Sequence, residues 1–482
     1  MISMLKKCWD DVRGSYWFVP ALMAVASIAL ALYLTQSQWV LDLSFLSSFS
    51  WLYKSTPEAA RQVLSTIAGS MITVASVTFS ITIASVAYAA SQFGPRLLTN
   101  FMYDRGNQLT LGTFIATFLY SLMVLRTLTG SDASPSDAFV PHIAVTLAVM
   151  LGVASIGVLI YFIHHVPSSI HASNVISDVG SQLLQKVNTL YPESDSDSEL
   201  EAIADLRDAG ELDGSIPDGF DAASEVRAQC DGFVQFVDNG VLVELAEALN
   251  TVVVLSVRPG DFVHAEKCLG WIVDSSSIGD AEVRQFRSAF LIGPKRTAAQ
   301  DVMFLSRELT EIAARALSPG VNDPFTAMSC MDWLCSALAV MAQRKTREAH
   351  RGSQGDKVRL ITNPVSAVYF VRHNLDMMRV YAATDRNAAL YFQVVLGRLL
   401  LLRLPAEIRQ VLFDQSKKLL ANAAESLCAP EVETLESRYN TLLNMSESTA
   451  STDKLYLECE WLGGCAPEGV SVLLSGRRQN LQ

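Results

Sequence analysis

Polar groups able to bind a ligand are concentrated in the segment Ala316-Leu-Ser-Pro-Gly-Val-Asn-Asp-Pro-Phe-Thr-Ala327. The groups in and near it that could contact a ligand or another subunit belong to Ser318, Asn322, Asp323, Thr326, Arg296 and Arg315. A purely structural interpretation accounts for the same residue types. Pro319 continues a helix poorly, whereas Asp323 followed by Pro324 is typical of an N-cap and a first helical position. The sequence therefore predicts a helix that begins at Pro324, and a ligand role for the loop stays open.

Small side chains follow one face of a long uncharged segment, residues 62–95. They recur at steps of three and four residues, which places them on one side of an α-helix. The eight positions, which we call the small-residue stripe, are Ser65, Gly69, Thr73, Ser76, Ser80, Ala84, Ala87 and Ser91. Such a face suits close helix packing within a membrane, and it equally suits the lining of a water-filled pore. Both interpretations stay open from the sequence.

Motifs that would indicate an enzyme or a bound cofactor are missing from the sequence. No serine-hydrolase elbow, Walker loop, Rossmann fingerprint or HExxH motif occurs. The eight cysteines lack the CxxC spacing of zinc sites, so we expect free thiols in a reducing compartment. Lys267 lacks the methionine neighbours of a biotinyl attachment site. We therefore assign no catalytic residue, no metal and no cofactor, and an enzyme is the less favoured class.

The elements that must position these residues include several membrane spans. Hydrophobic residues make up 50% of the chain and charged residues only 18%. A helix needs about 20 mostly apolar residues to cross the hydrocarbon core. Four stretches meet this requirement, at residues 16–35, 63–91, 109–128 and 139–162. The first could instead be a signal peptide, but its apolar run is long for one, and we predict a retained helix.

The orientation of the spans follows from the basic residues beside them. One side carries Lys6, Lys7, Arg13, Arg96 and Arg105, and the other carries Lys54, Arg61 and Arg126. The excess predicts a cytoplasmic N-terminus, and four spans return the C-terminal part to the cytoplasm. No acidic residue lies within a span, which disfavours an ion-coupled transporter. The net charge of −12 also argues against a nucleic-acid partner.

The rest of the chain reads as a soluble region in several parts. We predict a mostly α membrane protein in which four transmembrane helices precede an α+β domain with a small β-barrel-like module and a helical bundle. The expected divisions are a transmembrane domain at 1–165, a connecting helix and acidic loop at 166–224, the β-rich module at 225–277, the helical domain at 278–445 and a tail at 446–482. Within the module, strands are expected at 226–237, 251–257, 262–263 and 268–273.

Five stretches resemble a bacterial family of uncharacterised membrane proteins. They are Arg13-Gly-Ser-Tyr-Trp-Phe-Val-Pro-Ala-Leu22, Thr78-Phe-Ser-Ile81, Ser91-Gln-Phe-Gly-Pro-Arg96, Arg258-Pro-Gly-Asp-Phe262 and 316–327. Their order along most of the chain makes a chance similarity improbable. The resemblance implies a bacterial cytoplasmic (inner) membrane location and the same two-part architecture, but it brings no established activity.

Three classes of function remain for a chain of this kind. The first is a homo-oligomeric channel or conduit with the second span near its axis. The second is a membrane-anchored scaffold or sensor whose cytoplasmic domain binds a protein partner. The third is an enzyme acting on a membrane-delivered substrate. The expected partners are therefore the lipid bilayer, further copies of the chain and, for the second class, a cytoplasmic protein.

Overall fold

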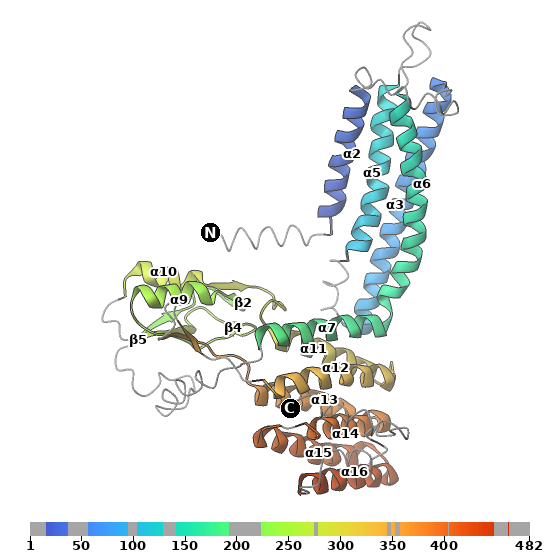
Figure 1. Cartoon of the computed structure of the whole chain (residues 1–482). Helices are drawn as coiled ribbons and strands as arrows, with labels where there is room; N and C mark the ends of the chain where they lie inside the picture. Colours follow the sequence, from blue (N-terminus) through green and yellow to red (C-terminus); the bar gives the residue numbers. More distant parts are fainter. Residues whose placement is uncertain are drawn as a thin grey trace, which may run out of the picture. The chain divides into compact units, whose positions relative to one another are not determined.

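The computed structural model describes residues 16–36, 56–94, 104–128, 141–191, 223–273, 278–344, 349–351, 357–402, 404–447 and Trp461 (Figure 1). The chain divides into two compact units, residues 1–175 and 176–482. The acidic loop that the sequence predicts before residue 223 lies outside the described residues, as does nearly all of the expected C-terminal tail.

Unit 1 is built from long apolar helices: α2 (Phe18–Gln36), α3 (Pro57–Phe93), α5 (Arg105–Thr127) and α6 (His142–Ile170). Local signals set their ends. Thr56 caps α3 by accepting a hydrogen bond from the Ala59 amide at 3.3 Å, and Gly94 ends it with a φ of 113°. Asp104 caps α5 through the Gly106 amide at 2.8 Å. The four helices cover the four spans that the sequence predicts, with α3 and α6 longer than expected.

Helix α5 is the centre of unit 1, since it packs against α2, α3 and α6. Its buried face carries Phe114 and Tyr120, both fully enclosed. The Tyr120 hydroxyl donates to the Ala144 carbonyl of α6 at 3.1 Å, and the hydroxyls of Thr117 and Ser155 are joined at 3.1 Å. Buried hydroxyls with partners of this kind hold helices together where a lipid environment supplies no hydrophobic drive.

Five described helices are long and apolar enough to cross a membrane, one more than the sequence analysis expected. The fifth is α12 (Pro324–Ala342) in unit 2. It packs against α11 (Val302–Ala316), α13 (Ala367–Ala382) and α14 (Arg386–Leu400). Its buried residues include Met331, Leu334 and Leu338. A helix enclosed by other helices is apolar on most sides whether or not it meets lipid.

The strands of unit 2 form two sheets. The first has the order β1 (Ala223–Arg227), β5 (Cys268–Val273), β3 (Val253–Leu255), β8 (Val358–Ile361) and β7 (Ala349–Arg351), and only its β3–β8 pair is parallel. The second has the order β4 (Phe262–Val263), β2 (Gly232–Val237) and β6 (Phe290–Gly293). The single strand expected at 226–237 is wrong, because β1 and β2 belong to different sheets. The two sheets do not confirm the barrel-like arrangement that the sequence analysis expected.

Strands also occur where the sequence analysis expected a helical domain. β6, β7 and β8 all lie within residues 278–445, and they complete sheets begun by strands earlier in the chain. These strands are three or four residues long. Segments of this length carry too little periodicity for prediction, since partner strands decide their conformation.

Helices make up the remainder of unit 2. α7 (Ala172–Leu190) leads into it from unit 1, and α9 (Asn239–Ala248) and α10 (Asp280–Ser288) pack with the strands. α11, α12, α13, α14, α15 (Ala406–Ser426) and α16 (Ala429–Glu447) then form a stack of helices (Figure 1). The described cysteines Cys230, Cys268, Cys330, Cys335 and Cys428 are free thiols, as predicted.

Candidate functional site

The small-residue stripe of α3 faces away from the other described helices of unit 1. All eight stripe positions are exposed: Ser65, Gly69, Thr73, Ser76, Ser80, Ala84, Ala87 and Ser91. A Cβ built at Gly69 would meet no atom of the described residues within 4 Å. Packing among the described helices of one protomer therefore does not account for the stripe.

The other side of α3 makes the contacts within the protomer. Its buried residues include Leu64, Ala68, Met71, Ala75 and Ala89. At 100° per residue, the centre of this face lies roughly 150° around the helix from the centre of the stripe. α3 thus has two opposed faces, and α5 and α6 cover only one of them.

The hydroxyl groups of the stripe bond to their own helix. Thr73 donates to the Gly69 carbonyl at 2.8 Å, and Ser76 and Ser80 donate to carbonyls one turn back at 2.9 Å. A hydroxyl that donates to the preceding turn keeps its oxygen lone pairs for a second partner. The stripe is therefore compatible with a neighbouring helix, with lipid and with water.

The loop before α12 has the local structure that the sequence predicts. The Asp323 carboxylate accepts a hydrogen bond from the Thr326 amide at 3.1 Å and another from the Thr326 hydroxyl at 2.7 Å. Pro324 is the first helical residue, and Asn322 adopts a φ of 49°. The Ser318 hydroxyl donates to the Arg315 carbonyl at 2.6 Å. The cap at Asp323 is thus confirmed, and the side chains of Ser318, Asp323 and Thr326 form hydrogen bonds within these turns.

The structure separates the two arginines that the sequence analysis placed near this loop. Arg315 lies in the last turn of α11 and pairs with Glu311 at 3.3 Å. Arg296 precedes α11 and pairs with Asp301, the N-cap of that helix. The 15 residues of α11 extend about 22 Å, so Arg296 and the loop lie near opposite ends of the helix.

Asp301, which the sequence also placed near this loop, is instead the centre of a second polar cluster at the other end of α11. Its side chain is 2% exposed and accepts from the Arg296 Nε at 2.9 Å and from the Met303 amide at 3.0 Å. Burial raises the pKa of the Asp301 carboxyl, and the Arg296 charge offsets this only in part. Gly260, with a φ of 96°, lies against both side chains, and a Cβ there would collide with the carboxylate. The turn around Gly260 and the start of α11 are therefore fixed to each other.

Further contacts extend this cluster to α13. The Arg258 guanidinium lies 4.8 Å from the centre of the Tyr369 ring, and Tyr369 stacks on His373 at 5.4 Å. The Arg307 Nη2 of α11 lies 3.2 Å from the His373 Nε2. Because a guanidinium only donates, His373 accepts this bond as a neutral ring. Burial lowers the pKa of His373, and the charge of Arg307 lowers it further.

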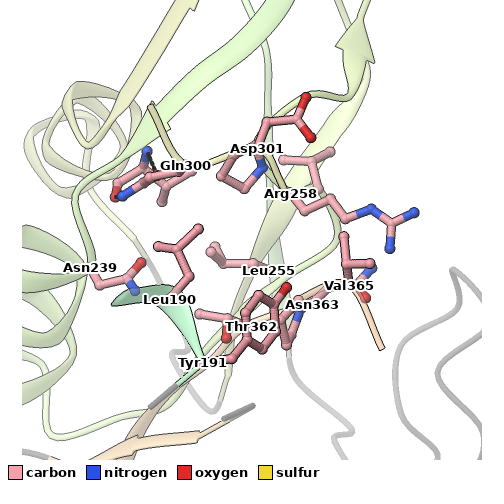
Figure 2. A pocket seen from close by; sticks show the side chains of 14 residues that line it. Leu190, Tyr191, Asn239, Leu255, Arg258, Gln300, Asp301, Thr362, Asn363 and Val365 are labelled. Atoms are coloured by element: carbon pink, nitrogen blue, oxygen red, sulfur yellow. Dashed lines mark hydrogen bonds between the residues drawn. The ribbon is translucent and has the colours of Figure 1, made fainter. Parts of the chain in front are cut away.

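A cavity of about 150 Å³ opens beside this cluster (Figure 2). Its walls include Leu190, Tyr191, Leu255, Arg258, Asn363 and Val365. Figure 2 shows Arg258 and Asp301 on one side of the cavity, Asn239 and Gln300 on another, and Tyr191 beside Thr362. Burial raises the pKa of the Tyr191 phenol to about 12, so this group is a neutral hydroxyl at physiological pH.

Comparison with known proteins decides the family. The model of a family described as "Predicted membrane protein (DUF2254)" matches residues 13–397. The chain belongs to the DUF2254 family. Uncharacterized proteins of Mycobacterium bovis and Mycobacterium tuberculosis are 32% identical to it over 379 residues, which cover 77% of this chain and 68% of theirs. No solved structure matches the chain. The resemblance seen in the sequence is thereby confirmed.

Two features of this DUF2254 protein needed the structure to be recognised. The Arg258-Pro-Gly-Asp-Phe262 segment carried the family resemblance, but only the fold places it against Asp301. In unit 1, the His165 Nε2 lies 2.7 Å from the Asp104 Oδ2, which ties α6 to the start of α5. For the Arg258–Phe262 segment, the signal in the sequence was a glycine between a proline and an aspartate. For the pair of His165 and Asp104, no local sequence pattern indicates a contact, because the two residues are far apart in the chain.

Proposed function

We propose that this DUF2254 protein is a homo-oligomeric membrane conduit in which α3 helices from neighbouring subunits surround the axis. The observation that carries the proposal is the outward position of all eight stripe residues, from Ser65 to Ser91. Small residues allow helix backbones to approach closely in a membrane, and hydroxyls among them can face water. A helix that contacts only lipid needs no face of small residues. Such a face does suit packing against the α3 helix of a second subunit.

The length of α3 supports the same assignment. Its 37 residues extend about 55 Å, against about 30 Å for the hydrocarbon core. The stripe runs along most of this length, so contact through it would continue beyond the bilayer on at least one side. A helix that extends beyond the bilayer is suited to connecting a pore with the space next to the membrane.

The proposed topology has four spans, α2, α3, α5 and α6, in a bacterial cytoplasmic membrane. α12 is assigned to the helical core of unit 2, because α11, α13 and α14 pack around it. With the N-terminus in the cytoplasm, unit 2 is cytoplasmic as well. In this topology, unit 2 would form the gate or the vestibule of the conduit.

One observation favours the scaffold function as a second candidate. Val321 is 47% exposed and Phe325 is 69% exposed, on the loop and the first turn that lead into α12. Exposed apolar side chains that form a continuous patch mark contacts with other proteins, and these two would form the centre of such a patch. This surface would serve a cytoplasmic partner whether or not α3 lines a pore.

The assembly is tested by measuring the mass of the full chain in native-lipid nanodiscs. Gly69→Leu and Ser80→Leu are expected to reduce the oligomer, since both place bulk on the stripe. Ser70→Leu is the matched control, because Ser70 is exposed on α3 but lies roughly 90° from the stripe centre. A monomeric wild type, or equal effects of Ser70→Leu and Ser80→Leu, would remove the basis of the conduit.

Water at the axis is tested separately by thiol labelling. Ser76→Cys and Ser80→Cys are expected to react with a membrane-impermeant thiol reagent above the level of the wild-type chain. If oligomers form and neither cysteine reacts, the stripe serves packing alone and the conduit is rejected.

A further inference from the structure

We infer that the cavity beside Arg258 binds a small organic acid, with the carboxylate on the Arg258 guanidinium and an apolar body against Leu190, Leu255 and Val365. Nothing in the family description or the relatives assigns a ligand to unit 2. The inference is independent of the proposed conduit, because it concerns residues of unit 2 only.

The size and walls of the cavity select the body of the ligand. A cavity of about 150 Å³ is large enough for a benzene ring. Leu190, Leu255, Val257 and Val365 give it apolar walls. A ring or a branched alkyl group would gain from leaving water there, whereas a nucleotide exceeds the available volume.

The Arg258 guanidinium has N–H groups that can donate hydrogen bonds to a ligand. Its ion pair with Asp261 is long, 3.7 Å from Nε to Oδ1, and its side chain is 25% exposed. Within the described part of the chain, no hydrogen bond engages its terminal nitrogens. A guanidinium presents parallel N–H donors that match the two oxygens of a carboxylate. Stacking on Tyr369 holds the group in position before a ligand arrives.

The neighbouring charges favour one anionic group and oppose a cation. Among the described residues, Asp301 is the only acid that lines the cavity, and Arg296 and the Met303 amide already occupy its oxygens. Arg296 is held by Asp301, and Arg307 is directed at His373. The charge of Arg296 is offset by Asp301, whereas the charge of Arg307 acts on Asp301 from nearby and adds positive potential beside the cavity. A single available guanidinium suits a monoanion better than a polyphosphate.

A ligand bound in this cavity would contact the end of α7. Leu190 and Tyr191 line it at the end of α7, the helix through which the chain enters unit 2. A ligand that packs against these residues stabilises the end of that helix. Metabolite binding would thereby act on the segment that follows the membrane spans.

The test uses the full chain in nanodiscs and saturation-transfer NMR with benzoate as the probe. Benzoate is expected to bind at millimolar concentration, benzyl alcohol much more weakly, and orthophosphate only weakly because it leaves the apolar walls uncovered. Arg258→Gln should weaken benzoate binding about tenfold, because a hydrogen-bonded charge contact is lost. Arg258→Lys should be intermediate, since it keeps the charge without the fork.

Two further variants keep the result interpretable. Val365→Phe fills the cavity and should abolish benzoate binding, whereas Arg284→Gln removes an exposed guanidinium on α10 and should change nothing. Near-ultraviolet circular dichroism confirms that each variant is folded. Equal binding of benzyl alcohol, orthophosphate binding as strong as that of benzoate, or no benzoate signal at all would each overturn the inference.

Discussion

Gly180 of α7 lies directly against the indole ring of Trp333 on α12. A methyl group at Gly180 would overlap the Cγ and Cδ2 atoms of that ring. The two helices therefore meet where one has no side chain and the other has the largest. This contact fixes α7 on the helical part of unit 2.

Gly180→Ala should destabilise unit 2 by about 1–3 kcal/mol, the usual cost of overpacking a core. The substitution also improves intrinsic helix propensity by up to about 1 kcal/mol, so a net loss would come from the collision. Thermal melting of the purified full chain, followed by tryptophan fluorescence, measures the effect. Gly320→Ala is the matched control, since a Cβ there meets nothing within 4 Å. An unchanged melting temperature for Gly180→Ala would contradict the contact.

Asp323→Ala should cost about 0.5–2 kcal/mol of stability, because the cap of α12 is lost. The Thr326 amide would then lack its side-chain acceptor. Asp323→Asn keeps an acceptor oxygen and should recover most of the loss. Glu436→Ala on the exposed face of α16 controls for the removal of a surface acid. A loss for Glu436→Ala as large as for Asp323→Ala would contradict the cap.

Stability of unit 2 should fall as the pH is lowered through the ordinary pKa of histidine, about 6.5. Burial and the charges of Arg307, Arg258 and Arg296 lower the pKa of His373 in the folded protein, and Asp376 opposes them. Between the folded and unfolded pKa values the unfolded chain binds the extra proton, so acid favours unfolding. Above the unfolded pKa the contribution is constant.

The measurement is the melting temperature between pH 5 and pH 8 for the wild type and for His373→Gln. Glutamine keeps an acceptor for Arg307 but does not titrate, so its profile should be flatter in the acidic range. Profiles of identical slope would show that His373 is not part of the acid sensitivity.

Reporter fusions should place Ser131 and Gln482 on opposite sides of the membrane. Ser131 lies between the third and fourth proposed spans, and Gln482 is the last residue of unit 2. A fifth span at α12 would bring both reporters to the same side. Alkaline phosphatase and green fluorescent protein fusions at each position therefore distinguish the two topologies.

Several features of the fold followed from the sequence because their causes are local. Hydropathy alone located α2, α3, α5 and α6, since any segment that crosses lipid must satisfy its backbone within its own helix. The Asp323-Pro324 cap depends on atoms within one turn, and it forms as predicted. The stripe on α3 was visible for the same reason, because helical spacing fixes which residues share a face.

Other features depended on parts of the chain that meet only after folding. β6 and β8 are short, and each is a strand because β2 or β3 offers it hydrogen-bonding partners. Arg258 and Asp301 line one cavity. From the local sequence, Arg258 looks like a turn residue and Asp301 like a helix cap. The exposure of the stripe was likewise decided by α5 and α6, which cover the opposite side of α3. Sequence spacing determines which residues share a face, whereas tertiary packing determines what that face meets, because burial depends on every neighbouring element at once.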